Sequence, residues 1–266
     1  MGNAADIAKE LAVPPGGLPS QIEQIDHRLN LIAAWQRGGA DFSARCVDIG
    51  CGQGDQTAAL AGLQQGEVVG VDPGPPDYGA PFTLAEAQAC LLASPLGARV
   101  TFEHSDAPSY LASTPLKFAT AVLSHSLWYF PSQAAILDTF VALRKAGVRH
   151  LALAEWSLSI GHLDALPHLL SVLTQSLDVG PDSEANVRCP VSPAVLRRLA
   201  EQAGWTLSHE ETLAQPSLRD GEWEAAAGRA LRGETPLMQT HSDALTAACE
   251  RTKSIACMDV WAAVFT

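Results

Sequence analysis

Apolar side chains recur along the chain in two different rhythms. Over residues 21–37 they return every three or four positions, which predicts an amphipathic helix that ends at Gly38 and Gly39. Further along, short runs of consecutive apolar residues are typical of buried strands. These runs cover residues 46–49, 67–71, 100–104, 118–124 and 150–155.

The segments between the strands predict helices. Thr83 and Glu86 have the spacing of a capping box, which indicates that a helix begins at residue 84. Strands that alternate with helices are typical of a parallel sheet with helices on both faces. The sequence therefore predicts an α/β fold, a three-layer α/β/α sandwich. Its expected helices cover 55–63, 84–93 and 131–146.

After residue 155 the alternation becomes irregular. Ser192 and Pro193 are typical of the start of a helix, and Gly204 is typical of its end. A further helix is expected near 162–176, strands at 205–210 and 257–265, and amphipathic segments around 222–232 and 242–255.

These patterns add up to a single domain over residues 1–266. Its sheet should have seven strands and be mostly parallel. Open α/β sheets bind their ligands at the carboxyl edge, and the helical parts outside the regular alternation should cover a ligand pocket there. They are the N-terminal segment 1–44 and the insertions 157–190 and 211–255.

Charge and cysteine usage restrict the partners. The chain has 17 Lys and Arg against 29 Asp and Glu, and its net charge of −12 would repel nucleic acid and anionic membranes. No apolar run approaches the roughly 20 residues of a membrane span. The six cysteines lack the spacing of a zinc site, so no metal is expected. We expect a reduced, cytoplasmic protein whose partner is a small molecule, and the sequence leaves its oligomeric state open.

Three glycines follow the first predicted strand. Gly50, Gly52 and Gly54 let the backbone approach a ligand and expose N–H groups at the start of a helix. The dinucleotide-binding pattern requires glycine at the next position, where this chain has Asp55. The ligand of this loop should therefore lack phosphates.

An acidic residue follows each of the next two strands. Asp72 ends the second strand, where a carboxylate can accept both hydroxyl hydrogens of a ribose. Asp106 follows the third strand and could accept a hydrogen bond from an adenine amino group. Together with the glycine loop, these acids predict a site for a nucleoside without phosphates.

The motifs VDIGCGQGD, GVD and SDA resemble the successive motifs of class I S-adenosylmethionine-dependent methyltransferases. The resemblance covers 45–156 well, and 21–44 and 190–210 more loosely. It implies a Rossmann-like fold with an antiparallel seventh strand, and S-adenosylmethionine as the cofactor. The glycine loop would hold the methionine part of the cofactor, and the two acids its ribose and adenine. The cofactor site implied in this way comprises Asp48, Gly50, Cys51, Gly52, Gly54, Asp72, Pro73, Asp106, Ala107 and Ser124.

The end of the fourth strand is where an acceptor should bind, because open α/β folds bind ligands at this edge. His125 could take a proton from a hydroxyl or amine, with an ionisation at about pH 6–7, or it could be a hydrogen-bonded structural residue. Trp128 and Tyr129 could form an aromatic wall around the acceptor, or they could be ordinary core aromatics. Glu155 could orient the acceptor or pair within the sheet edge.

Two further side chains have open interpretations. Cys51 could be a reactive thiol or a small side chain packed beneath the loop, and nothing nearby in the sequence would lower its pKa. His162 and His168 are spaced as a pair on the surface of a helix.

The predicted enzyme is a methyltransferase. It would transfer a methyl group from S-adenosylmethionine to an O or N atom of a small, aromatic or natural-product acceptor. The segments SHSLWYF and AEW are also similar to small methyltransferases of microbial secondary metabolism. Two alternatives remain open: a protein that uses the cofactor for a rearrangement or elimination without methylation, and a catalytically silent interaction subunit.

Overall fold

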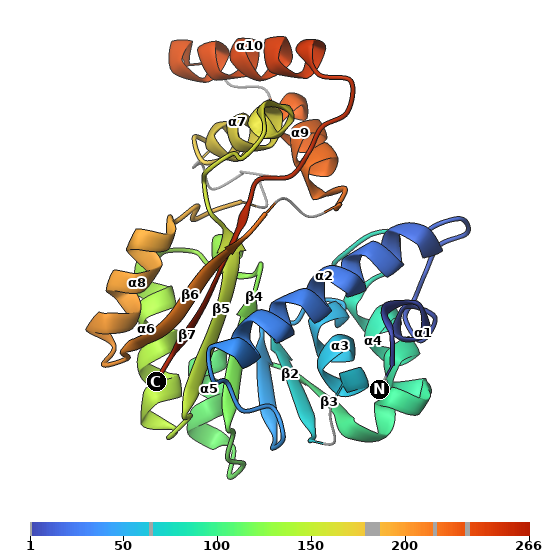
Figure 1. The fold of residues 1–266 in the computed structure, drawn as a ribbon, viewed down its shortest axis with the longest axis vertical. Helices are drawn as coiled ribbons and strands as arrows, with labels where there is room; N and C mark the ends of the chain where they lie inside the picture. The colour runs from blue at the N-terminus through green and yellow to red at the C-terminus, as the bar shows by residue number, and fades with distance from the viewer. Residues whose placement is uncertain (1, 64–65, 179–186, 215–216, 232–234) are drawn as a thin grey trace.

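A seven-stranded sheet forms the centre of the protein (Figure 1). The computed structural model describes residues 2–63, 66–178, 187–214, 217–231 and 235–266. The strand order is β3-β2-β1-β4-β5-β7-β6, in which β7 is antiparallel to both of its neighbours and the other pairs are parallel. The strands are β1 (Cys46–Ile49), β2 (Val68–Asp72), β3 (Val100–His104), β4 (Thr120–Ser124), β5 (His150–Trp156), β6 (Leu207–Leu213) and β7 (Val260–Phe265).

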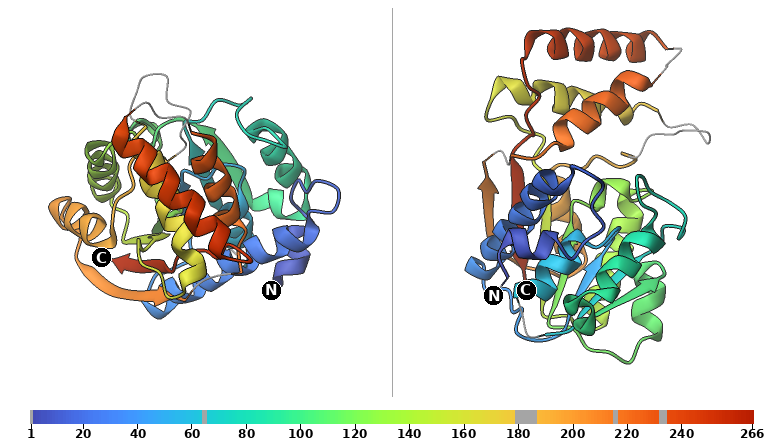
Figure 2. Two further views of the ribbon diagram at one scale, coloured as in Figure 1. Left: turned by 90° about the horizontal axis from the view of Figure 1, so that it is seen from above. Right: turned by 90° about the vertical axis from the view of Figure 1, so that its right-hand side faces the viewer.

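Helices cover both faces of the sheet, as expected for a parallel α/β sheet (Figure 2). One layer contains α1 (Ala4–Ala8), α2 (Leu18–Arg37) and α3 (Asp55–Leu63), which pack on one another. The opposite layer contains α5 (Ala107–Ser113), α6 (Gln133–Lys145) and α8 (Pro193–Gln202). Helix α4 (Leu84–Ala93) packs beside β3 and the short η1 (Pro95–Arg99).

Three helices form a separate group beyond the carboxyl edge of the sheet (Figure 1). This group, which we call the cap, consists of α7 (Leu166–Gln175), α9 (Asp220–Ala230) and α10 (Pro236–Arg251), which pack on one another. The short η3 (Leu163–Ala165) leads into α7, and η2 (Leu127–Tyr129) follows β4. The insertions expected at 157–190 and 211–255 supply the cap helices, although residues 211–213 still belong to β6.

The core explains why α2 lies where it does. Its buried face presents Ile25, Leu31, Ile32 and Trp35, spaced so that they return to one side of the helix. The indole Nε1–H of Trp35 donates a hydrogen bond to the carbonyl of Leu153 in β5 over 2.9 Å. A fully buried aromatic side chain and a satisfied polar group thus fix the helix to the middle of the sheet.

The seven-stranded sandwich predicted from the sequence is confirmed, and the expected capping box of Thr83 and Glu86 is present. Two short helices, α1 and α5, are absent from the sequence prediction because each is too short to show a helical period. Their caps are local signals instead: Asn3 accepts a hydrogen bond at the start of α1, and Asp106 does so at the start of α5. Within the described residues, no helix combines the length and apolar character that a membrane span requires.

The packing of Trp35 predicts a large stability effect. Trp35→Ala should lower the free energy of unfolding by about 3–5 kcal/mol, because it leaves a cavity and removes the hydrogen bond to Leu153. Urea denaturation followed by circular dichroism measures this change. Trp223→Ala is the matched control, since Trp223 is 51% exposed and its loss should change stability by less than about 0.5 kcal/mol. Equal effects of the two substitutions would contradict this view of the core.

Candidate active site

The strand order reverses between β1 and β4, and the loops that follow these strands meet at the carboxyl edge. The hydroxyl of Ser126, after β4, donates a hydrogen bond to the carbonyl of Ile49 in β1 over 3.0 Å. Gly50 has a φ of +71°, and a Cβ atom there would lie 2.6 Å from the Cβ of Ser126. Only glycine therefore lets the two loops come this close.

The glycine loop is held in shape by Asp72. Gly52 N–H donates to Asp72 Oδ2 over 2.8 Å, and Gly74 N–H donates to Oδ1 over 2.7 Å. Gly52 and Gly54 have φ values of +53° and +101°, which favour glycine at both positions. One carboxylate thus joins the loop after β1 to the loop after β2.

A pocket of about 120 Å³ opens beside this carboxylate. It is bounded by the ends of β2 and β3 and by α4, and it has both polar and apolar walls. Its lining residues are Asp72, Gly74, Pro76, Leu84, Ala85, Gln88, Phe102, Glu103 and His104. Such a mixture suits a ribose and a flat base.

The other expected cofactor residues are placed around this pocket in different ways. Ala107 is buried, whereas Asp106 and Pro73 are exposed. Asp106 Oδ1 accepts the N–H of Ser109 as the cap of α5, and this hydrogen bonding lowers its pKa. The carboxylate therefore keeps its charge and has one oxygen left for an amino group.

Two expected residues lie beneath the loop rather than in the pocket. Asp48 is buried and accepts a hydrogen bond from the Thr57 hydroxyl over 2.6 Å, and burial raises its pKa to about 7. Cys51 is buried against Gly70, where a Cβ atom would lie 2.9 Å from its Sγ. Burial raises the pKa of the Cys51 thiol, so the packed interpretation of this residue is the one that the structure favours.

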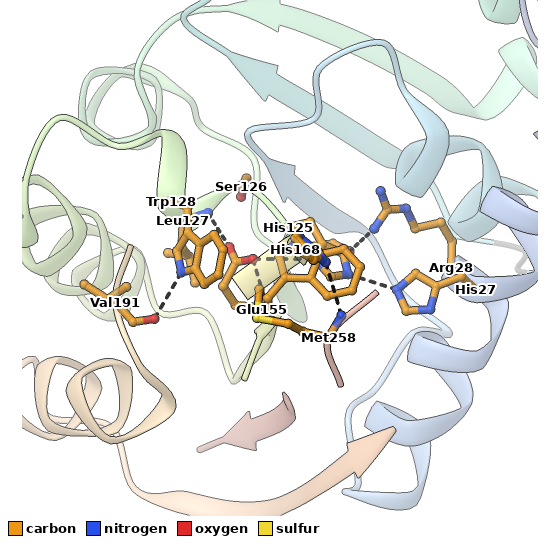
Figure 3. Close-up of polar contacts among 12 residues, drawn as sticks. His27, Arg28, His125, Ser126, Leu127, Trp128, Glu155, His168, Val191 and Met258 are labelled. Atoms are coloured by element: carbon orange, nitrogen blue, oxygen red, sulfur yellow. Dashed lines mark hydrogen bonds and ion pairs between the residues drawn. The ribbon is translucent and has the colours of Figure 1, made fainter. Parts of the chain in front are cut away.

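His125 directly follows β4, away from the pocket beside Asp72 (Figure 3). Its backbone has a left-handed conformation with φ of +51°. Its Nε2 lies 2.9 Å from His27 Nε2 on α2, and its Nδ1 lies 3.5 Å from Glu155 Oε1. Nδ1 has no hydrogen-bond partner within the described residues. Burial lowers the pKa of His125 well below its usual value, as does the nearby Arg28. The sequence-based value of about 6–7 is therefore too high.

Glu155 holds the turn that follows β4. Its Oε2 accepts the N–H of Leu127 over 3.1 Å, and its Oε1 accepts the N–H of Trp156 over 3.0 Å. The side chain is 1% exposed, and burial raises its pKa to about 8. It is thus a neutral or partly ionised acid near pH 7–8 that fixes the position of η2.

A second pocket lies between the sheet edge and the cap. Trp128 is buried in its wall, and its Nε1–H donates to the carbonyl of Val191 over 3.0 Å, while Tyr129 is half exposed. The pocket is mainly aromatic, with two imidazoles and two carboxyl groups. Its lining residues are His125, Trp128, Tyr129, Glu155, Trp156, His168, Val172, Val187 and Glu224.

Helix α2 adds a polar row that the sequence analysis did not use. Gln21 donates to Asp55 over 2.8 Å, and Gln24 donates to Asp220 of the cap over 2.6 Å. Arg28 Nη1 donates to Ser124 Oγ over 3.2 Å, and the Nε of Arg28 has no partner within the described residues. Positions 21, 24 and 28 share one face of a helix, so this spacing was a signal that could have been found.

The expectation that His162 and His168 form a surface pair is wrong. His162 is exposed, but His168 is fully buried. The reason is that α7 packs between the other cap helices and the edge of the sheet, where the Trp156 ring centroid lies 4.8 Å from that of His168. Among the described residues, no group of His, Cys, Asp and Glu could hold a metal ion.

A family model described as a methyltransferase domain matches residues 20–210. Methyltransferase phomM' from Diaporthe leptostromiformis is 32% identical over 211 residues, which make up 62% of this chain and 54% of that protein. The chain thus spans about half the length of the curated relatives that it matches.

Solved structures share the fold over nearly the whole chain. A cyclopropane-fatty-acyl-phospholipid synthase-like protein from Lactobacillus casei is 32% identical, with a TM-score of 0.88 over 99% of this chain and 98% of that one. The [4+2]-cyclase SpnF shares the fold at 18% identity, with a TM-score of 0.51 over 96% of this chain and 82% of that one. The match of the family model, and the likeness to the first structure over its full length, identify this chain as a member of the class I S-adenosylmethionine-dependent methyltransferase family.

Proposed function

We propose that this chain transfers a methyl group from S-adenosylmethionine to an O or N atom of a small aromatic acceptor. The observation that carries the proposal is the pair of pockets on the two sides of the reversal of strand order. One pocket surrounds Asp72 and suits a nucleoside, and the other is aromatic and contains His125 and Glu155. The glycine loop lies beside Ser126 and hence between them.

The residues beside β1 and β2 fit this cofactor. Asp72 uses two of its lone pairs for backbone N–H groups and has two left for the ribose hydroxyls. Arg28 is half-buried, and its Nε–H, which has no partner among the described residues, would bind the carboxylate at the methionine end. When bound, the cofactor supplies an activated methyl group on a sulfonium, so the protein needs chiefly to position the acceptor and exclude water.

His125 is the base in this proposal. With the ring proton on Nε2, His125 donates to His27 Nε2 and keeps a lone pair on Nδ1. The proton that the acceptor loses as it bonds to the methyl group moves to this Nδ1. Glu155 Oε1 lies 3.5 Å from this nitrogen, and the ionised form of Glu155, whose fraction grows as the pH approaches 8, would stabilise the imidazolium. His27 and Glu155 are positioning residues, because they act through His125.

The cap closes the acceptor pocket from the side opposite the sheet. Val172 and His168 of α7 and Glu224 of α9 line the pocket, and the hydrogen bond from Gln24 to Asp220 joins the cap to α2. Water would be excluded when these elements close over an acceptor. The walls of this pocket are largely aromatic, and its space of about 10 Å³ requires the cap to move outward before an acceptor enters.

A rearrangement or elimination without methylation is the second candidate, since SpnF, a [4+2]-cyclase, shares this fold. An unpaired imidazole nitrogen beside the acceptor pocket favours methyl transfer, because that reaction releases a proton. Incubation with S-adenosylmethionine carrying a radioactive methyl group, and a panel of phenols and aromatic amines, separates the candidates. Label that reaches no acceptor of the panel, while S-adenosylmethionine still binds, would overturn the proposal.

Removal of the Asp72 carboxylate should weaken cofactor binding. Asp72→Ala is expected to raise the dissociation constant of S-adenosylmethionine about 10- to 100-fold, or roughly 1–3 kcal/mol, because the ribose hydroxyls lose charged hydrogen bonds. Isothermal calorimetry measures this constant. Asp138→Asn, an exposed acid on α6, is the control and should bind as the wild type does. An unchanged constant for Asp72→Ala would place the ribose elsewhere.

Removal of the His125 imidazole should slow turnover. His125→Ala is expected to reduce kcat about 10²–10⁴-fold with little change in cofactor affinity. Since burial lowers the pKa of His125 and the neutral ring is active, protonation of His125 should reduce the wild-type rate only well below pH 6.5. The exposed His162→Ala is the control. A loss of less than tenfold would show that alignment alone suffices.

The raised pKa of Glu155 predicts a pH-dependent stability. Above about pH 7.5 the histidines of the unfolded chain, whose usual pKa is about 6.5, are mostly neutral. Between there and pH 8 the folded chain keeps a proton on Glu155 that the unfolded chain has lost, so stability falls as the pH rises. Asp48, with a pKa of about 7, adds to the same fall.

The variant Glu155→Gln keeps an acceptor for the N–H of Leu127 but cannot ionise. Its free energy of unfolding should fall less steeply than that of the wild type, by up to about 1.4 kcal/mol per pH unit. Urea denaturation at a series of pH values measures both slopes. Glu86→Gln is the control, because the capping box lowers the pKa of Glu86 and its titration lies at acid pH. Parallel wild-type and Glu155→Gln slopes would contradict the raised pKa.

A further inference from the structure

The cap is packed as a separate part of the chain. Its three helices pack closely on one another, and within the described residues none of them packs closely on a strand of the sheet or on a helix beside it (Figure 1). Two of its stems leave the neighbouring strands β5 and β7, where the N–H of Ser157 donates to the carbonyl of Asp259 over 2.9 Å. Leu158 in the first stem has φ of +55°, a strained conformation for a residue with a side chain. Parts of a chain that share a small interface move relative to each other, and these paired stems have the place of a hinge.

A hydrogen bond joins the cap to the sandwich away from these stems. Gln24 of α2 donates from Nε2 to Oδ2 of Asp220, the first residue of α9, over 2.6 Å. The two residues lie 196 positions apart, and the Gln24 side chain is buried. This bond can form only while the cap lies against α2, so it stabilises that position of the cap.

The position of the cap in this structure closes the acceptor pocket. His168 and Val172 of α7 and Glu224 of α9 form the walls on the cap side. The space between these walls and the edge of the sheet is about 10 Å³, which is about the room for one water molecule. An acceptor can therefore reach His125 only after the cap has moved away.

We infer that Gln24 and Asp220 form a latch that holds the cap closed and thereby controls the entry of the acceptor. The inference rests on the proposed function in that it takes this pocket to be the acceptor site. Opening of the cap breaks the latch and gives water access to His168, and closing re-forms the latch and excludes water during the reaction. Gln24 and Asp220 are positioning residues, because they act through the cap.

Chemical labelling of His168 measures the opening directly. Diethyl pyrocarbonate acylates neutral imidazoles that water can reach, and mass spectrometry of peptides locates the product. In the wild type the buried His168 should react at least tenfold more slowly than the exposed His162. Gln24→Leu removes the donor and should accelerate the labelling of His168 about tenfold. Cys46 is buried in β1, and its unchanged reaction with a thiol reagent would exclude global unfolding.

A matched control lies three positions earlier on the same helix. Gln21 donates to Asp55 of α3 over 2.8 Å, so Gln21→Leu removes a similar hydrogen bond that does not involve the cap. It should leave the labelling of His168 unchanged. Gln24→Lys keeps a donor for Asp220 and should be labelled as slowly as the wild type. The double variant Gln24→Leu with Asp220→Ala should be labelled no faster than the faster of the two single variants, because both break the same bond.

Several outcomes would overturn the inference. They are a wild-type labelling rate in Gln24→Leu, an equal acceleration in Gln21→Leu, additive effects in the double variant, and a reaction of Cys46 that accelerates together with that of His168. Wild-type His168 that reacts as fast as His162 would show that no latch holds the cap closed. None of these measurements uses methyl transfer. A latch confirmed in a chain that methylates nothing would leave the gating of this pocket standing and refute the proposed function instead.

Discussion

The reversal of strand order between β1 and β4 is the constraint on which the site depends. Chain connections leave these two strands towards opposite sides of the sheet, so the loops that follow them border an open crevice. The glycine loop can enter this crevice because Gly50 has no side chain to meet Ser126. Asp72 then joins that loop to the next one. These contacts hold the loops after β1, β2 and β4 together at the carboxyl edge of the sheet.

Helix α2 completes the crevice and shows how buried polar groups are tolerated. Its apolar face packs on the sheet through Trp35, and its polar row reaches the loops and the cap. The polar row has partners on three different elements. Gln24 contacts α9, His27 contacts the loop after β4, and Arg28 contacts β4 itself. A buried polar group without a partner is costly, so these contacts fix the register of the helix against the site.

Burial also sets the charges in the pocket between the sheet edge and the cap. Loss of water raises the pKa of Glu155 to about 8 and lowers those of His125 and His168. All three changes favour the neutral form, and burial also raises the pKa values of Tyr129 and Glu224, so the pocket has little net charge although it contains five ionisable groups. A pocket of this kind suits an uncharged ligand better than an ion.

The sequence by itself determined the strands, their order of succession, and the loop chemistry of Gly50 and Asp72, because periodicity and turn residues are local properties. Only the tertiary structure brought His27 to within 2.9 Å of His125, 98 positions along the chain, and buried His168 beside Trp156. Apolar patterns show which face of an element is buried, but not which polar groups meet there. The protonation states follow from that burial, and so they too were decided by the fold.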